Sequence, residues 1–157
     1  MIRLAQDGEA MLAKTIVDAA YGHYVARIGG LPGPMRDDYA ARVAAGELYF
    51  CGDSPQRPPQ GLLVLIDAPD HLLLDNIAVL PAAQGTGVGR ALLAFVDAEA
   101  ARRGYTELRL YTHEKMHENI ALYARLGWEE TSRATQNGLA RVFFRKTVSV
   151  QGLPSRV

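Results

Sequence analysis

The sequence becomes rich in glycine at Gln84-Gly85-Thr86-Gly87-Val88-Gly89-Arg90. The preceding residues 72–79 are mostly apolar and predict a strand, and residues 91–96 continue as an amphipathic helix. A glycine-rich turn between a strand and a helix exposes backbone N–H groups at the positive end of the helix dipole. Glycine lets the backbone approach a ligand closely, because it has no Cβ. The stretch therefore predicts an anion site, and phosphate is the best fit.

Two common phosphate loops have other spacings. A P-loop has Gly-Lys followed by Ser or Thr, whereas here Gly89 is followed by Arg90-Ala91. A dinucleotide fingerprint reads G-x-G-x-x-G, whereas the glycines here read G-x-G-x-G. The sequence also shows no clear set of carboxylates for Mg²⁺. These differences disfavour an enzyme that acts on nucleotide phosphates.

Two motifs together resemble one family. Gln84-x-x-Gly87-x-Gly89 matches the Q/R-x-x-G-x-G/A pattern of the GNAT superfamily of N-acetyltransferases. The preceding Asn76-Ile77-Ala78-Val79 is similar to that family's fourth strand, and residues 120–128 resemble its second signature, a short helix ending A-x-x-x-Y-x-x-x-G-F/W. The resemblance covers residues 1–147 as one domain, and residues 148–157 are expected to form a loose tail.

The resemblance implies an α/β fold with a GNAT-like mixed, mostly antiparallel twisted sheet that is splayed at its centre and flanked by about four helices. It also implies acetyl-CoA as a co-substrate, with its diphosphate on the N–H groups of the glycine-rich loop. The strand before the loop would pair with the pantetheine amides, and the N–H near Val79 would face the thioester oxygen. The cofactor-binding residues so implied are Ile77, Ala78, Val79, Gln84, Gly85, Thr86, Gly87, Val88, Gly89, Arg90, Ala91, Asn119 and Tyr123.

Composition narrows the class of protein. A length of 157 residues favours a single domain. Lys and Arg number 17, as do Asp and Glu, so no basic excess favours a nucleic-acid partner. No apolar segment reaches the ~20 residues of a membrane span, and the N-terminus has no signal-peptide pattern. Cys51 is the only cysteine, which excludes an internal disulfide. We expect a cytoplasmic protein without membrane partners.

Hydrophobic periodicity and turn residues predict the element order βααβββαβαββ. Asn137-Gly138 is the preferred pair for a type I′ hairpin turn. Strands are predicted at residues 2–5, 47–51, 61–66, 71–79, 107–111, 128–135 and 139–146, and helices at 8–27, 35–45, from the glycine loop to about 103, and at 116–126.

Acetyl transfer to an amine requires a proton donor for the leaving thiolate. Given the second motif, the phenol of Tyr123 is the best candidate for this acid. Asn119 lies one helical turn earlier on the same face. The commonest family pattern has Asn seven residues before the tyrosine and Ala four before it, whereas this chain has Met116 and Asn119. A cofactor contact from Asn119 is therefore an open alternative.

The proton acceptor for the amine has two candidates. Asp75 is the one acidic residue in an apolar strand, where burial would raise its pKa. His113, placed just past the fifth strand, has an unperturbed pKa of about 6.5, which suits a base. The four histidines follow no metal-ligand spacing, so no metal is assigned.

The sequence thus predicts an acetyl-CoA-dependent N-acetyltransferase that acts directly on a primary amine of a small molecule, peptide or protein. Residues 28–39 and the final hairpin are expected to form the acceptor wall, with Asp37, Asp38 and Tyr39 as candidates for recognising a cation. A non-catalytic acyl-CoA-binding or sensor module on the same fold is the alternative. A homodimer is also open.

Overall fold

The computed structural model describes residues 1–148. It shows a seven-stranded sheet, five α-helices and two short 3-10 helices in this part of the chain. The strands are β1 (Ile2–Leu4), β2 (Leu48–Cys51), β3 (Gly61–Asp67), β4 (Leu72–Val79), β5 (Glu107–His113), β6 (Glu129–Gln136) and β7 (Leu139–Thr147). The helices are α1 (Ala10–Tyr21), α2 (Tyr24–Ile28), η1 (Gly33–Arg36), α3 (Tyr39–Ala44), η2 (Pro81–Ala83), α4 (Val88–Arg102) and α5 (His117–Arg125).

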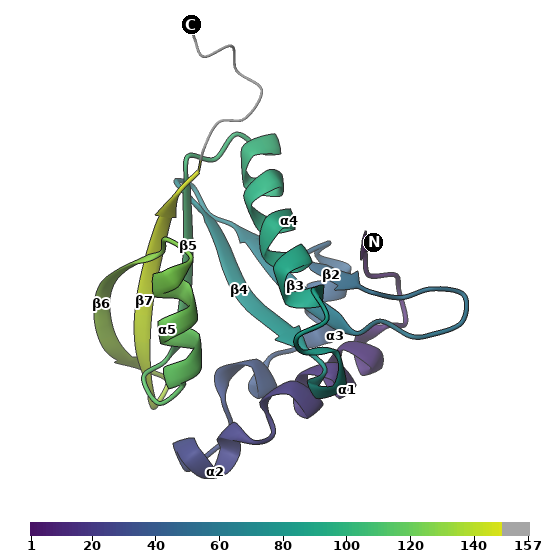
Figure 1. Ribbon diagram of the computed structural model, residues 1–157, viewed down its shortest axis with the longest axis horizontal. Coiled ribbons are helices and arrows are strands. Elements are labelled where there is room, and N and C mark those ends of the chain that lie inside the picture. The colour runs from purple at the N-terminus through teal and green to yellow at the C-terminus, as the bar shows by residue number, and fades with distance from the viewer. Residues whose placement is uncertain (149–157) are drawn as a thin grey trace, which may run out of the picture.

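The strands follow the order β1-β2-β3-β4-β5-β7-β6 across the sheet (Figure 1). All neighbours are antiparallel except β4 and β5, which are parallel. In Figure 1, α4 and α5 stand in front of the sheet and α1 to α3 gather at its lower end. The mixed, mostly antiparallel sheet expected from the sequence is confirmed.

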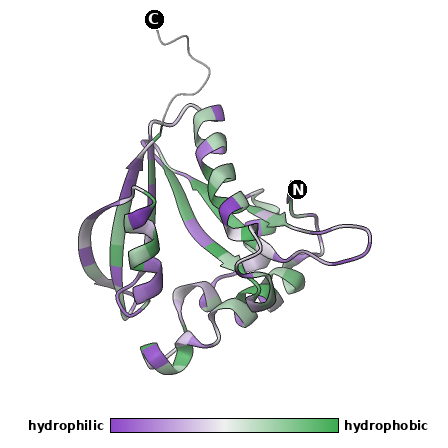
Figure 2. Ribbon diagram, in the orientation of Figure 1, coloured by the Kyte–Doolittle hydropathy of each residue, from purple (hydrophilic) through white to green (hydrophobic). Residues whose placement is uncertain are grey.

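Buried side chains fill the space on both faces of the sheet. Leu63 and Leu65 of β3 belong to one cluster, with residues of α4 and α5, whereas Leu62 and Val64 belong to the other, with residues of α1 and α3. Because β3 is covered on both faces, its sequence is a continuous apolar segment rather than an alternating one. At the edge of the sheet, all eight residues of β6 are exposed, and Figure 2 shows the hydropathy of the strands falling toward this edge.

The sheet splits at its centre. Residues Leu72–Leu74 of β4 pair with Leu108–Leu110 of β5, and no pair joins the two strands beyond that point. β4 nevertheless continues beside β3 to Val79, and β5 continues beside β7 to His113. Figure 1 shows the two strands diverging below their paired ends. The splayed centre that the family resemblance implied is therefore present.

A β-bulge marks the point of divergence. Val64 of β3 pairs with Asn76, but the adjacent Leu65 pairs with Leu74, so Asp75 is an extra residue in β4. A bulge bends its strand and re-aims the side chain of the inserted residue. Here it places two consecutive polar residues, Asp75 and Asn76, where the central strands separate.

Two helices differ from the sequence prediction. The first was expected to run over residues 8–27, but α1 ends at Tyr21, with Gly22 as its C-cap, and α2 follows separately. Glycine is a poor helix former, because an unfolded glycine has more conformational freedom to lose. The second was expected from residue 35, but α3 begins later, because the Asp38 carboxylate caps it by accepting from the Ala41 N–H at 3.1 Å.

The final hairpin turns as expected. Asn137 and Gly138 have φ values of 52° and 77°, and a type I′ turn needs positive φ at both central residues. After β7, Val148 is buried and donates its N–H to the carbonyl of Thr106 at 2.9 Å, so this residue belongs to the core. The rest of the expected tail lies outside the described residues. Among the described helices, none has both the length and the apolar character that crossing a membrane requires.

Candidate active site

The glycine-rich loop ends at the N-terminus of α4, where Gly87 is the N-cap. Gly85 and Gly87 have φ values of +81° and +96°, a left-handed conformation that favours glycine. A Cβ added to either residue would meet no atom within 4 Å, so the outer side of the loop is open. Within residues 1–148, no backbone hydrogen bond uses the N–H groups of Gly85, Gly87, Val88, Gly89 and Arg90. Together with the helix dipole, these groups have the arrangement that the predicted anion site requires, and binding of an anion here stays a prediction.

Two residues of the loop serve its own structure. Ala91 was expected to offer its N–H to a ligand, but it donates to the carbonyl of Gly87 at 2.9 Å in the first hydrogen bond of α4. Thr86 directs both its N–H and its hydroxyl to the carbonyl of Ala83 and so tightens the turn. Gln84 and Arg90 are exposed beside the open N–H groups.

β4 offers a free backbone edge where β5 has diverged. Leu80 donates to the carbonyl of Gln60 at 2.9 Å, which sets the alternation of hydrogen bonds between the antiparallel β3 and β4. By this alternation, Ala78 exchanges its hydrogen bonds with β3, whereas the N–H groups of Ile77 and Val79 point toward the split. Ile77 and Val79 therefore fit a strand that pairs with an extended ligand. Ala78 does not, because its backbone groups are used within the sheet.

A tyrosine that sequence reasoning missed holds this edge in place. Tyr21 of α1 donates its hydroxyl to the carbonyl of Ile77 at 2.7 Å and lies 3.0 Å from Oδ1 of Asn76. Asn76 is buried and donates to the hydroxyl of Tyr39 in α3 at 2.9 Å. The network ties two helices to β4 just where that strand loses its second neighbour. No local pattern marks Tyr21, because its partners lie more than fifty residues away.

A cavity of about 40 Å³ occupies the split between β4 and β5. The three catalytic candidates Asp75, His113 and Tyr123 all line it. Ile77 and Asn119 line it as well. A space of this size holds a water molecule or a small ligand group. The structure thus brings together candidates from β4, β5 and α5 at one point.

Tyr123 has a buried hydroxyl without a partner. Its ring packs against Trp128 and Phe144, with ring centroids 6.0 and 5.9 Å away. Only 6% of the residue is exposed, and its hydroxyl makes no hydrogen bond with residues 1–148. Burial raises the pKa of Tyr123 above its ordinary value, so the phenol keeps its proton at neutral pH. It is therefore a proton donor that faces a cavity.

Asp75 projects from the bulge with 12% of its side chain exposed. Tyr111 of β5 donates its hydroxyl to Asp75 Oδ1 at 2.6 Å, and Nη2 of Arg42 lies 3.7 Å from Oδ2. Burial raises the pKa of Asp75 above 3.8, against the opposing effects of Tyr111 and Arg42. A carboxylate with an increased proton affinity suits a general base. Sequence reasoning missed both partners, because the fold alone brings them to the bulge.

His113 is a weaker base than its type suggests. It is the last residue of β5 rather than a loop residue beyond it. Its Nδ1 accepts the N–H of Lys115 at 3.0 Å, so the proton of the neutral ring is on Nε2 and neither nitrogen is a free acceptor. Burial also lowers the pKa of His113. Of the two bases that the sequence left open, the geometry favours Asp75.

Asn119 reaches the same region from α5. Its Nδ2 lies 3.5 Å from Oγ1 of Thr112 and 3.6 Å from Sδ of Met116, which are long contacts for an amide donor. The side chain is part-buried beside the cavity. Asn119 thus lies beside the split, and a cofactor contact from it stays a prediction.

The expected acceptor wall is partly in place. Gly33 and Pro34 of η1 and Leu139 and Arg141 of the hairpin line the cavity. The acidic residues of the wall make contacts within the fold, and their recognition of a substrate cation stays a prediction. Asp37 accepts from Nε of Arg42 at 2.9 Å, and Asp38 caps α3. The hydroxyl of Tyr39 donates to the carbonyl of Pro34 and accepts from Asn76. In residues 1–148, no group of three or more His, Cys, Asp or Glu side chains is placed to hold a metal ion.

A family model described as the acetyltransferase (GNAT) domain matches residues 39–130, more than half of the chain. The chain belongs to the GNAT family of acetyltransferases. The mouse N-alpha-acetyltransferase 80 is 34% identical over 65 residues, which are 41% of this GNAT protein and 19% of the mouse protein. The matched region therefore spans about a fifth of that relative's length.

Solved structures share the whole fold of this GNAT protein. The ribosomal-protein-S18-alanine N-acetyltransferase from Escherichia coli has a TM-score of 0.72 at 21% identity and covers 98% of this chain and 97% of its own. The PaiA N-acetyltransferase from Thermoplasma acidophilum, solved in complex with coenzyme A, has a TM-score of 0.75 at 14% identity. The match covers 94% of this chain and 98% of the PaiA chain. A GNAT-family protein from Desulfovibrio desulfuricans has a TM-score of 0.75 at 21% identity, and the match covers 95% of this chain and 99% of the other.

Proposed function

We propose that this protein is an acetyl-CoA-dependent N-acetyltransferase that transfers the acetyl group directly to a primary amine of a small molecule, peptide or protein. The observation that carries the proposal is the cavity at the split of the sheet. A phenol that keeps its proton and a carboxylate of raised pKa both line it, from different elements. Membership of the GNAT family supports acetyl transfer as the reaction.

The residues present fit acetyl-CoA, which would supply an acetyl group activated as a thioester. The open N–H groups at the start of α4 suit the two phosphates of its diphosphate. The N–H groups of Ile77 and Val79 on the free edge of β4 suit the pantetheine amides and the thioester oxygen. The Thermoplasma acidophilum neighbour with coenzyme A bound supports this choice of ligand.

The chain's own side chains supply the proton transfers. Asp75 would accept a proton from the attacking amine, and its raised pKa favours this role. Tyr123, which also lines the cavity, would donate its hydroxyl proton to the leaving sulfur. Tyr111 would keep the Asp75 carboxylate aligned through its 2.6 Å hydrogen bond. The buried setting strengthens each of these interactions, because little water screens them.

Release of free thiol from acetyl-CoA tests the proposal. The full chain is incubated with acetyl-CoA and a panel of primary amines, and mass spectrometry identifies any acetylated amine. We expect thiol release that depends on the amine and on Tyr123. Binding of CoA without turnover of any amine would instead support the non-catalytic acyl-CoA-binding module. The cytoplasmic location and the homodimer remain predictions.

A further inference from the structure

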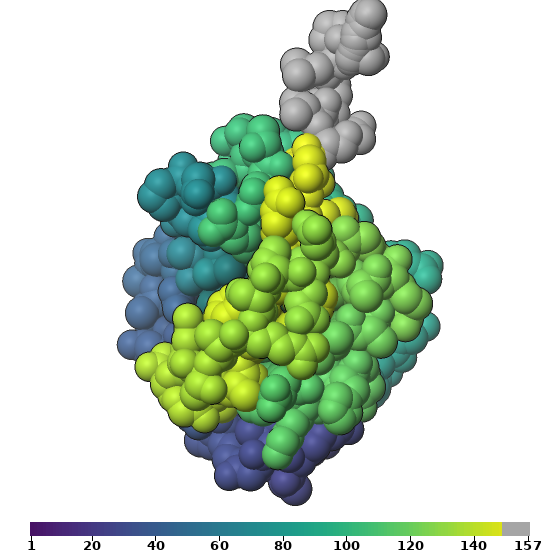
Figure 3. Space-filling model, turned by 90° about the vertical axis from the view of Figure 1, so that its left-hand side faces the viewer, coloured from purple at the N-terminus to yellow at the C-terminus, as the bar shows by residue number. Residues whose placement is uncertain are grey.

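A groove of about 680 Å³ adjoins the cavity and extends over the outer strands of the sheet. Leu110, Tyr111, Asp75 and Arg141 line both spaces, so the groove leads directly to the proposed base. Figure 3 views the molecule from the side of the β6–β7 hairpin, which forms one wall of the groove. The cavity alone is too small for a substrate, whereas the groove has room for the body of an amine.

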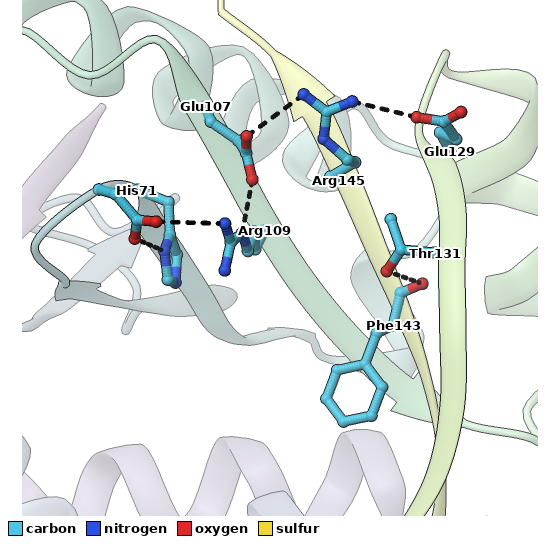
Figure 4. A network of polar contacts seen from close by, with 8 residues as sticks. His71, Glu107, Arg109, Glu129, Thr131, Phe143 and Arg145 are labelled. Atoms are coloured by element: carbon cyan, nitrogen blue, oxygen red, sulfur yellow. Dashed lines mark hydrogen bonds and ion pairs between the residues drawn. The ribbon is translucent and has the colours of Figure 1, made fainter.

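Most charges in the groove neutralise one another. Arg145 lies 3.2 Å from Glu107 and 3.2 Å from Glu129. Arg109 lies 2.5 Å from Glu107 and 3.5 Å from Asp70. Figure 4 shows these ion pairs as one chain of contacts across the strands. A charged ligand gains little binding free energy from groups that are already paired in this way.

Arg141 is different. It lines the groove without an ion pair to any carboxylate of residues 1–148. Its guanidinium lies over the ring of Tyr111, 4.2 Å from the centroid, and Nη1 donates to Oε1 of Gln136 at 3.1 Å. Gly33 of η1 flanks it so closely that an added Cβ would lie 3.3 Å from Nη2. Uncharged groups thus hold a permanent cation in one place beside the site.

The position of Arg141 relates it to the reacting amine. The guanidinium of Arg141 lies over the ring of Tyr111, and the hydroxyl of Tyr111 donates a hydrogen bond to Asp75. In the groove, the ring of Tyr111 therefore lies between Asp75 and Arg141, and an amine that delivers its proton to Asp75 has room to reach the guanidinium along this ring. A guanidinium fork matches the two oxygens of a carboxylate.

We propose that Arg141 binds a carboxylate of the acceptor, so that the preferred substrates are primary amines carrying one carboxylate. The inference rests on the proposed N-acetyltransferase activity and adds the substrate class. Among residues 1–148, Arg141 is the one groove-lining arginine without an ion pair, and one such cation matches one anionic group. The carboxylate would orient the substrate while the amine reaches the cavity.

Matched acceptors and variants test this assignment. The acceptors are ω-amino acids from glycine to 6-aminohexanoate, each compared with its own carboxamide. For at least one pair we expect wild-type kcat/KM to be about 10–100-fold higher for the acid, the range for a hydrogen bond to a charged group. Arg141→Gln should remove that preference by lowering kcat/KM for the acid far more than for the amide. Arg141→Lys should keep part of the preference, because it keeps the charge.

Arg145→Gln is the matched control. Arg145 lies in the same strand and groove, but it is paired with two glutamates, so its loss should leave the acid-to-amide ratio unchanged. Equal use of acids and amides by the wild type would overturn the inference and leave the N-acetyltransferase proposal standing. So would an Arg141→Gln variant that slows both members of a pair equally. Failure of every amine in the panel would overturn the proposed function, and this inference with it.

Discussion

Tyr123 combines burial with a hydroxyl that has no partner in the described chain. Leaving a buried polar group unpaired costs about 1–3 kcal/mol, so native structures contain few such groups. A phenol in this state is costly for folding and useful for chemistry. It keeps its proton, because burial raises its pKa, and it lines the cavity where sulfur would leave.

Tyr123→Phe should lower kcat by about 10²–10⁴-fold, the usual contribution of general acid catalysis. Binding of acetyl-CoA should change little, and thermal stability should stay equal or rise, because the change removes only an unpaired hydroxyl. Steady-state kinetics, calorimetric titration and melting curves measure the three effects. Tyr105→Phe, whose hydroxyl bonds to Asp67 at the other end of the sheet, is the control. An unchanged kcat would make Tyr123 a packing residue.

Asp75 as the proposed base gives kcat/KM a predictable pH dependence. Asp75 must be ionised to accept a proton, so the acidic limb of kcat/KM should lie above pH 3.8, in the direction of its raised pKa. Asp75→Asn should lower kcat strongly and abolish this limb, because the amide cannot take up the proton. His113→Gln should retain the limb, since its ring has no free acceptor. Should His113→Gln abolish the limb instead, the histidine is the base.

The same carboxyl links stability to pH. Its pKa is raised in the folded protein, so the stability it contributes is complete below the unfolded pKa of about 3.9 and is lost as pH rises through the folded pKa. The Asp75→Asn variant lacks this loss. Its free energy of unfolding should therefore increase relative to wild type as pH rises from about 4, and then level off above the folded pKa. Urea unfolding at a series of pH values measures the difference, and a constant difference would contradict it.

At the start of α4, two glycines of one motif serve different purposes. Gly87 has a φ of +96°, which a β-branched residue tolerates poorly. Gly89 has no positive φ, and a Cβ there would lie 3.7 Å from Cγ2 of Val79, an ordinary contact. Backbone strain therefore explains Gly87, whereas room for a ligand is the remaining reason for Gly89.

Gly87→Val should abolish measurable CoA binding and destabilise the protein by about 1–3 kcal/mol through its strained backbone. Gly104→Val provides the control for strain. Gly104 follows the opposite end of the same helix with a φ of +86° and equally open surroundings. The Gly104→Val variant should lose a similar amount of stability and bind CoA normally. Calorimetric titration with CoA separates the two variants, and normal binding by folded Gly87→Val would show that the loop is only a turn.

Acetyl-CoA should stabilise the whole molecule, because its proposed site draws on the loop, β4 and α5 together. At a concentration of 100 times Kd, the stabilisation is about 2.7 kcal/mol. For a chain of this size that corresponds to a rise in Tm of about 5–10 °C. ATP and NAD should raise Tm less, since the loop has the spacing of neither nucleotide motif. No binding of CoA at millimolar concentration would contradict the central proposal.

Local sequence patterns were sufficient to predict the features that neighbouring residues determine. The loop before α4 was predictable, because glycines that precede an amphipathic helix produce open N–H groups by their own geometry. The Asn137-Gly138 turn was predictable, because both residues accept a positive φ. The end of α1 at Tyr21 was missed, because apolar periodicity continued through Gly22 and outweighed the weak helix propensity of one residue.

The split sheet and its side-chain partners depended on contacts between distant segments. The sequence showed an acidic residue in an apolar strand, but the bulge at Asp75 exists only in the register of β4 against β3. The proposal of Asp75 rather than His113 as the base used the hydrogen bonds of Tyr111 and Lys115, which periodicity does not reveal. The proposed role of Arg141 depends on the ion pairs of Arg109 and Arg145, which leave Arg141 as the groove arginine without a carboxylate partner in residues 1–148. A sequence specifies each side chain's chemistry locally, whereas burial, partners and free charge arise when distant strands pack together.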